Sequence, residues 1–131
     1  MIVAGVGCRR GAPAPDIEAA VRAALARANI SAGALDVIAT IAAKRGEAGI
    51  QAAAEKLGVP VIVVLDADLQ TASDRTETRS ERVLALAGVP SVAEAAALAA
   101  AGPAARLISP RLVVGAATCA LAASAQLPRG A

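Results

Sequence analysis

The residues best suited to chemistry follow the first apolar run of the chain, in a turn that holds Gly5, Gly7, Cys8, Arg9, Arg10 and Gly11. A glycine loop between a strand and a helix directs backbone N–H groups toward the positive end of that helix, which favours an anion. The planar guanidinium of arginine matches a carboxylate or a phosphate with two parallel hydrogen bonds. The turn therefore predicts an anion-binding site. The alternative is that the glycines only permit a tight turn and that the arginines are solvated.

Other polar candidates are expected where strands end, because ligands of open α/β sheets gather at the carboxyl ends of the strands. They are Lys44, Arg45 and Glu47 in a polar turn, Ser91 at a helix start, Arg111 after a proline and Thr118 in the last strand. Ser91 and Glu94 have the spacing of a capping box, so the Ser91 hydroxyl is expected to cap its own helix. No catalytic residue can be assigned from these positions.

Cys8 lies beside two arginines and before a helix, surroundings that favour a thiolate. The chain has no histidine to act as its base, so an incidental or structural thiol is the favoured interpretation. Cys119, in an apolar strand, is expected to be inert, and both are expected to be free thiols. Asp66 and Asp68 alternate without the pattern of a calcium loop, and no metal or cofactor is expected.

Composition excludes several classes of protein. The chain has no His, Phe, Tyr or Trp, which rules out an imidazole base and base stacking on aromatic rings. Its 13 basic and 11 acidic side chains are scattered, so nucleic acid is not an expected partner. No apolar run has the length of about 20 residues that a membrane span needs, and the start lacks the pattern of a signal peptide. A cytoplasmic protein is predicted.

A dinucleotide site is an alternative of low rank. Gly5, Gly7 and Gly11 lie near the phosphate-binding pattern of Rossmann folds, and Lys44 and Arg45 could meet the 2′-phosphate of NADP. No second domain remains to hold a substrate for hydride transfer.

Alternating strand and helix patterns predict an α/β fold for a single domain over residues 1–131, with three α/β/α layers. The sheet is expected to be mostly parallel, with about five strands and with helices on both faces. Strands are expected at Ile2 to Gly5, Asp36 to Ile41, Val61 to Leu65, Leu107 to Ser109 and Leu112 to Ala123. The branched run Val61 to Leu65 is typical of a strand covered on both faces.

Helices are expected from about Pro15 to Ala28, from Ile50 to Leu57 with Gly58 as its end, and from Ser91 to Ala101. Residues 66–82 are charged and polar and are expected to form a mobile loop, since ordinary connections have about 4 to 6 residues. Residues 126–131 are expected to be a frayed tail.

Four segments together resemble the CobE / CbiG C-terminal-domain family of cobalamin biosynthesis. They are Gly5-Val6-Gly7-Cys8-Arg9-Arg10-Gly11, the turn from Ala39-Thr40-Ile41 to Lys44-Arg45-Gly46-Glu47, the segment Gly88 to Leu98, and the stretch Gly115 to Ala122. The resemblance covers nearly the whole chain in the expected order. Two departures stand out: Ala12-Pro13-Ala14-Pro15 replaces a Ser or Thr cap that is frequent in the family, and Arg111 stands where the family often has Lys.

The resemblance implies a protein that binds or hands on an anionic precorrin or corrin intermediate, whose partners would include methyltransferases of the corrin pathway. Corrin precursors carry carboxylates around a flat apolar ring, which suits basic residues at a rim and an apolar floor. The alternative is an enzyme acting on a precorrin, by rearrangement or by the lactone opening with acetaldehyde release that the resemblance attributes to CbiG-type proteins. The further domains that the resemblance attributes to CbiG-type proteins are not expected within these 131 residues. A homodimer is left open.

Overall fold

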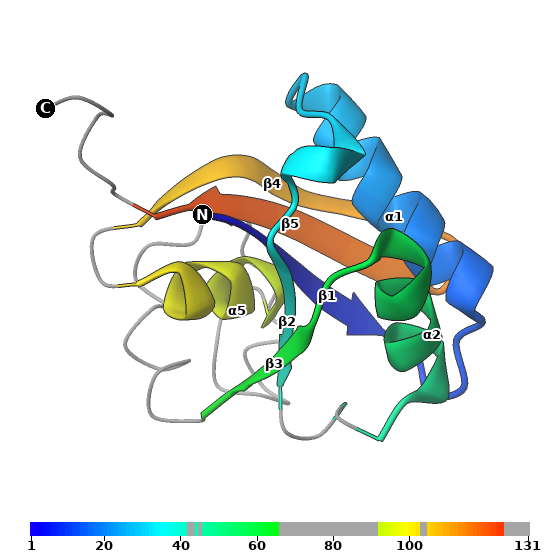
Figure 1. The fold of residues 1–131 in the computed structure, drawn as a ribbon. Coiled ribbons are helices and arrows are strands. Elements are labelled where there is room, and N and C mark those ends of the chain that lie inside the picture. The colour runs from blue at the N-terminus through cyan, green and yellow to red at the C-terminus, as the bar shows by residue number, and fades with distance from the viewer. Residues whose placement is uncertain (42–43, 45, 66–91, 103–104, 125–131) are drawn as a thin grey trace, which may run out of the picture.

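The computed structural model of the chain describes residues 1–41, 44, 46–65, 92–102 and 105–124. In chain order its elements are β1 (Ile2–Cys8), α1 (Ala14–Arg27), a 3-10 turn (Ala32–Ala34), β2 (Val37–Ile41), α2 (Ala48–Leu57), β3 (Val61–Val64), α5 (Val92–Ala101), β4 (Arg106–Val114) and β5 (Ala117–Ala123) (Figure 1). The expected loop 66–82 and tail 126–131 lie outside the described residues.

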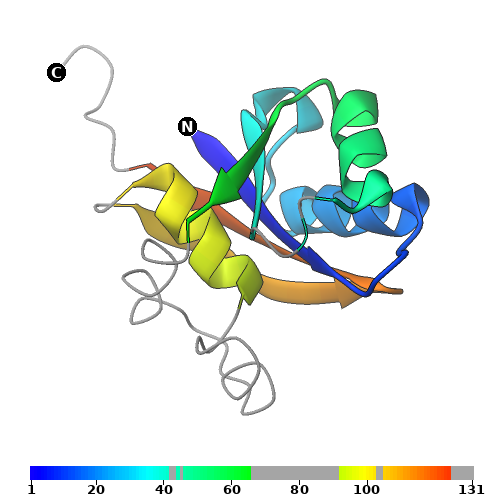
Figure 2. The ribbon, with the colours of Figure 1, turned by 90° about the horizontal axis from the view of Figure 1, so that it is seen from below.

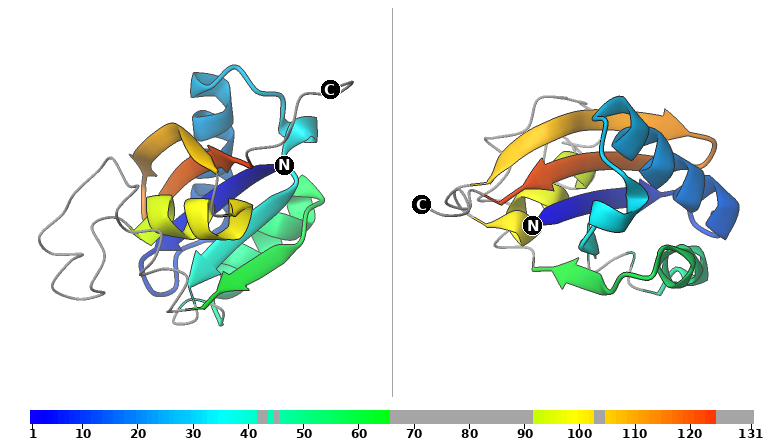
Figure 3. Two further views of the ribbon diagram at one scale, coloured as in Figure 1. Left: turned by 90° about the vertical axis from the view of Figure 1, so that its left-hand side faces the viewer. Right: turned by 45° about the horizontal axis from the view of Figure 1, so that its top comes forward.

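The strands form one five-stranded sheet in the order β3-β2-β1-β5-β4, and Figure 3 shows this order from one edge to the other. β1 pairs with β2 and β2 pairs with β3 in parallel, whereas β5 pairs with both β1 and β4 in the antiparallel sense. The α/β prediction is confirmed, and so is the number of strands. The prediction of a mostly parallel sheet is wrong, because Gly115 has a positive φ of 56° and lets the chain fold back into a β4-β5 hairpin.

The sheet buries apolar side chains on both faces. One cluster joins Ala4, Val6 and Ile38 of the sheet to Ile17 of α1 and Ile50 of α2. The other joins the alternate residues Val3, Val37 and Ala39 to α5, in which Ala95, Ala96, Ala97 and Leu98 are buried. Since successive side chains of a strand point to opposite faces, α5 packs against one face, and α1 and α2 pack against the other (Figure 2).

The first strand is longer than expected. β1 keeps its pairing with β5 from Ile2 as far as Cys8, so Gly5 and Gly7 lie within a strand and only the residues after Cys8 form the loop. A Cβ built on Gly5 would lie 2.0 Å from the carbonyl oxygen of Ala93 and 2.7 Å from the nitrogen of Ala97. Gly5 therefore lets the backbone of α5 approach the sheet closely.

β3 is an edge strand, and the expectation that its branched run is covered on both faces holds for only part of the run. Ile62 is 38% exposed and Leu65, just beyond the strand, is 67% exposed. The apolar run is continuous because Val61 packs against the first cluster and Val64 lies in the second, whereas Ile62 belongs to neither cluster.

The helix boundaries agree with the patterns that predicted them. α1 has proline in its first turn and Asp16 near its start, and Glu18 pairs with Arg22 at 2.8 Å. Pro13 precedes α1 and no side-chain hydrogen bond caps the helix, as its Ala-Pro-Ala-Pro sequence implies. α2 ends at Gly58, whose φ of 74° is left-handed.

Candidate functional site

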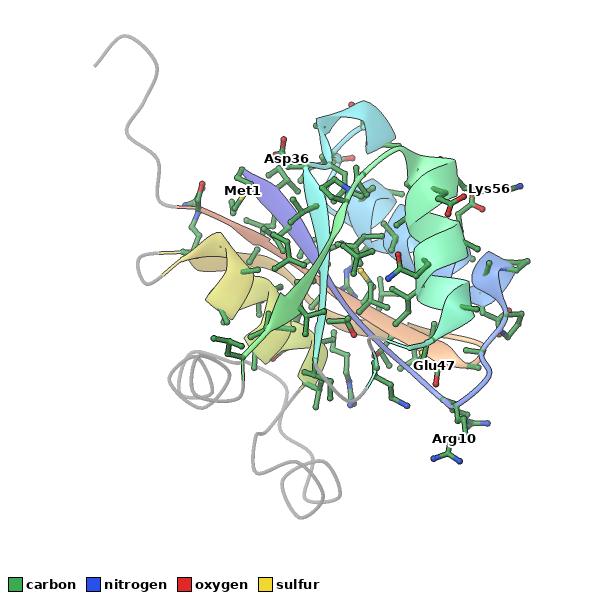
Figure 4. All side chains as sticks on the ribbon, turned by 60° about the horizontal axis from the view of Figure 1, so that its bottom comes forward. Met1, Arg10, Asp36, Glu47 and Lys56 are labelled. Atoms are coloured by element: carbon green, nitrogen blue, oxygen red, sulfur yellow. The ribbon has the colours of Figure 1, made fainter. Side chains whose placement is uncertain are left out.

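The carboxyl ends of the three parallel strands lie at one edge of the sheet, and most of the predicted site residues come together there. The loop after β1 carries Arg9, Arg10 and Gly11, and the turn between β2 and α2 carries Lys44 and Glu47. A hydrogen bond of 2.9 Å from the Gly11 N–H to Glu47 Oε1 joins the two segments. In Figure 4 the labelled Arg10 and Glu47 lie at the same end of the molecule, whereas Met1 and Asp36 lie at the other end. We call Arg9, Arg10, Gly11, Lys44 and Glu47 the carboxyl-edge cluster.

Three amides of the loop are engaged with the protein itself, so the glycines do not form the open cradle of N–H groups that the sequence predicts. The Arg9 N–H donates to the carbonyl of Ala116, the Ala12 N–H donates to the carbonyl of Arg9, and the Gly11 N–H is held by Glu47. Gly11 itself adopts a left-handed φ of 74° that closes the turn. The positive charge offered by this loop therefore comes from side chains.

The arginines of the loop are free to meet a ligand. Arg9 and Arg10 are exposed, and among the described residues neither guanidinium has a hydrogen bond or an ion pair. Acidic side chains nearby are occupied by backbone amides: Glu47 by Gly11, and Asp16 by the Ala116 N–H at 3.0 Å. The cluster thus presents cations whose charge is not taken up by the neighbouring carboxylates.

Gly7 and Thr118 form a second part of this edge, on neighbouring strands. The Thr118 hydroxyl donates to the carbonyl of Gly7 at 3.3 Å. A Cβ built on Gly7 would lie 2.8 Å from the Thr118 hydroxyl oxygen. On the next strand Thr118 pairs with Val113, whose side chain is 61% exposed. Gly7, Thr118 and Val113 are therefore neighbours across three strands, in a strip of sheet next to the charged loop.

The remaining predicted site residues lie elsewhere. Gly5 is in the middle of β1 beneath α5, and Arg111 is on the edge strand β4. Arg45 and Ser91 lie outside the described residues, and with Ser91 the expected capping box.

Glu94 was expected to serve that capping box, and the structure gives it a further role. Its side chain is completely buried, and Oε2 accepts the N–H of Arg111 at 2.9 Å. The pairing register of β4 with β5 shifts between Ser109 and Leu112, so this amide lies at an irregularity in the ladder. On the other face of the sheet Arg27 donates to Ser109 Oγ and to the carbonyl of Pro110. The bulge is held from both sides.

Replacing Glu94 with alanine is expected to lower the free energy of unfolding by about 1 to 3 kcal/mol, because the Arg111 N–H would lose its acceptor. Urea unfolding followed by circular dichroism measures the loss. Glu94→Gln keeps an acceptor oxygen and is expected to lose less. Equal losses in the two variants would contradict this role of the hydrogen bond.

Thr40 belongs to one of the segments that carry the family resemblance, but the sequence does not mark it as a candidate contact. It is fully buried at the end of β2, and its hydroxyl donates to the carbonyl of Val6 at 3.1 Å. The sequence held one signal for this residue: Thr40 is the polar residue of an apolar strand that ends just before the Lys44 turn.

The thiol of Cys8 does not have the character that its neighbouring arginines suggested. Burial raises its pKa above the ordinary value, while Lys44 lowers it and Glu47 raises it. Burial outweighs the positive charge, so a thiolate is disfavoured. The result agrees with the favoured interpretation of an unreactive thiol.

Burial also raises the pKa of Cys119 from 9.0 to about 12. The Cys119 thiol is protonated below pH 9 in both the folded and the unfolded chain. Above pH 9 the unfolded chain loses this proton first, because the pKa of its thiol is lower. We therefore expect the free energy of unfolding to fall as the pH rises from 9 toward 12. Urea titrations across this range should show a smaller fall for Cys119→Ala, and identical pH dependence in the two proteins would contradict the assignment.

Within the described ranges, no group of three or more Cys, Asp or Glu side chains is placed to hold a metal ion. None of the helices described there combines the length and the apolar character needed to cross a bilayer. The dinucleotide alternative also loses support, because antiparallel β5 occupies the place beside β1 where a Rossmann sheet has a parallel strand.

Comparison with known proteins yields a consistent set of relatives. The sequence model of the family described as "Cobalamin synthesis G C-terminus" matches residues 2–122. A protein of Sinorhizobium sp named "Protein CobE" is 40% identical over 126 residues, which are 96% of this chain and 82% of that protein.

Solved structures give the same result. A crystal structure of CobE, described as a protein from the cobalamin (vitamin B12) biosynthetic pathway, matches with a TM-score of 0.86 and 36% identity, over 93% of this chain and 89% of that one. The cobalamin biosynthesis protein chiG of Agrobacterium tumefaciens matches with a TM-score of 0.77 and 44% identity, over 96% of this chain and all of that one. A putative cobalamin biosynthesis protein G homolog of Sulfolobus solfataricus, 19% identical with a TM-score of 0.65, shares the fold over 92% of this chain and 36% of its own.

Proposed function

This chain belongs to the cobalamin synthesis G C-terminus family of cobalamin biosynthesis, and from that premise we propose that it binds an anionic precorrin or corrin intermediate and hands it on. The binding site is the carboxyl-edge cluster, with Arg45 and Ser91 as further predicted contacts. The proposed setting is the cytoplasm, where the methyltransferases of the corrin pathway would supply or receive the ligand.

The observation that carries the proposal is that the positive charges at this edge of the sheet are available to a ligand. Arg9 and Arg10 are exposed and make no ion pair among the described residues, and Lys44 lies close enough to Cys8 to influence its pKa. A molecule with several carboxylates on its rim can engage such cations together. Hydrogen bonds to charged groups contribute about 1.5 to 3 kcal/mol each, so two or three of them support specific binding.

A flat apolar ring also needs apolar surface beside these cations. The strip Gly7, Thr118 and Val113 offers it: Gly7 has no side chain, the Thr118 hydroxyl is turned to the Gly7 carbonyl, and Val113 is exposed. The predicted contacts Gly7 and Thr118 thus serve the ring, while Arg9, Arg10 and Lys44 serve its carboxylates. The buried Gly5 supports the site through packing, and Arg111 would extend it along β4.

Binding is favoured over catalysis because the described residues of the cluster do not form an acid, base or nucleophile set. Burial disfavours the Cys8 thiolate, and the Glu47 carboxylate is engaged with a backbone amide. The chain has no histidine. An enzyme acting on a precorrin is the competing function, and it would be recognised by turnover.

The proposal is tested by titrating the protein with cobyrinic acid, a corrin with free carboxylates, and with its fully methyl-esterified form. The protein has no Trp, Tyr or Phe, so the near-ultraviolet and visible spectrum of the corrin is almost free of protein absorbance. A spectral shift that saturates with the acid, and binding of the ester at least about tenfold weaker, are expected. Equal affinity for both would contradict the role of the cations, and a new absorbing species that accumulates with time would show an enzyme.

A further inference from the structure

In the loop after β1, Gly11 is the residue whose backbone N–H is bound by a side chain, that of Glu47. Glu47 precedes the first residue of α2, where a side chain often caps its own helix, but it makes no such cap. Its Oε1 instead crosses to the loop after β1 and accepts the Gly11 N–H at 2.9 Å. The geometry shows that this amide, directly after the two arginines of the loop, donates a hydrogen bond to a carboxylate.

The contact is weakly held. It is a single hydrogen bond on the exposed side of the loop, and Glu47 forms no ion pair with Arg9, Arg10 or Lys44 in the part of the chain that the structure describes. Because water competes for this exposed hydrogen bond and no ion pair adds to it, the Gly11 N–H is open in a minor fraction of the molecules. A carboxylate that also engaged a neighbouring guanidinium would bind the same amide more strongly.

We propose that Glu47 acts as an internal stand-in for the ligand: a carboxylate of the ligand replaces it at the Gly11 N–H, and Glu47 swings away. This inference rests on the proposed function and adds to it the regulation of the site. While Glu47 occupies the amide, only the fraction of molecules with the amide open is competent, and the apparent affinity is reduced by that fraction. The displaced Glu47 carboxylate also leaves a negative charge beside the bound ligand, and this charge favours dissociation of the anionic ligand.

The test compares Glu47→Ala, Glu47→Gln and the control Glu55→Ala, which removes the same charge from an exposed position near the end of α2. Cobyrinic acid is expected to bind about tenfold more tightly to Glu47→Ala than to the original protein, with Glu47→Gln in between because its amide oxygen still accepts a hydrogen bond. Glu55→Ala is expected to leave the affinity within about twofold.

A second readout does not depend on a corrin. In proton–nitrogen correlation spectra, acetate is expected to shift the Gly11 amide of Glu47→Ala at concentrations that leave the same amide unmoved in the original protein. The dispersion of these spectra also reports whether each variant is folded. If Glu47→Ala loses its fold, Glu47→Gln carries the comparison.

The outcomes separate the two proposals. Weaker or unchanged binding of cobyrinic acid by both Glu47 variants would overturn the stand-in role, and so would an equal gain in Glu55→Ala. If no variant binds cobyrinic acid but acetate shifts Gly11 only when Glu47 is absent, the exchange stands and the proposed function fails.

Discussion

Gly5→Ala is expected to lower the free energy of unfolding by about 3 kcal/mol or more. The new Cβ would lie 2.0 Å from the carbonyl oxygen of Ala93 and 2.9 Å from the Cβ of Ala97. The nearest of these atoms belong to the backbone of α5, so no side-chain rotation can relieve the clash and the whole helix must move off the sheet. Domains of this kind have a stability of about 5 to 15 kcal/mol, so the loss is a large part of it.

The matched control is Gly33→Ala. A Cβ there meets nothing within 4 Å, so the variant is expected to change the free energy of unfolding by less than about 0.5 kcal/mol. Urea unfolding at one temperature compares the two directly. A Gly5→Ala protein as stable as the control would show that α5 does not lie on β1 as closely as described.

The double replacement Arg9→Ala, Arg10→Ala is expected to weaken binding of cobyrinic acid by about 100-fold or more, and Arg9→Ala alone by about tenfold or more. Each guanidinium is exposed and without an ion pair among the described residues, so its charge is available to the ligand. The loss of one charge-assisted hydrogen bond corresponds to about 1.5 to 3 kcal/mol. The spectral titration with cobyrinic acid measures these affinities.

Arg106→Ala serves as the control for net charge. Arg106 is exposed at the start of β4, where it pairs with Ala123 at the end of the sheet opposite the loop. Its replacement is expected to change the affinity by less than about threefold, and the ester should bind the original protein and the three variants alike. Equal losses from Arg106 and from the loop arginines would mean that overall charge, and not this loop, attracts the ligand.

Local patterns were sufficient to predict the helices. Proline and Asp16 mark the start of α1, and Gly58 stops α2, because helix ends depend on the backbone preferences of single residues. Strand pairing depends on distant segments, so the direction of β5 beside β1 could not be read from either strand alone. The exposed Ile62 shows the same limit, since a run of valine and isoleucine does not reveal whether its strand has neighbours on both sides.

The candidate site could be predicted in part. Residue types and the strand-loop-helix order brought Arg9, Arg10, Lys44 and Glu47 to one edge, as the sequence implied. What the sequence could not show is which amides the protein satisfies itself. The Gly11 N–H is taken by a carboxylate 36 residues further along the chain, and that contact exists only once the two segments fold together.

The most direct test of the central claim is a map of backbone amide shifts in the original protein as cobyrinic acid is added. The largest changes are expected at Arg9, Arg10, Gly11 and Lys44, at the end of the molecule that Figure 4 marks with Arg10 and Glu47. Changes concentrated around Met1 and Asp36, at the opposite end of β1, or no changes at saturating corrin, would contradict the claim that the carboxyl-edge cluster binds the carboxylates of the ring.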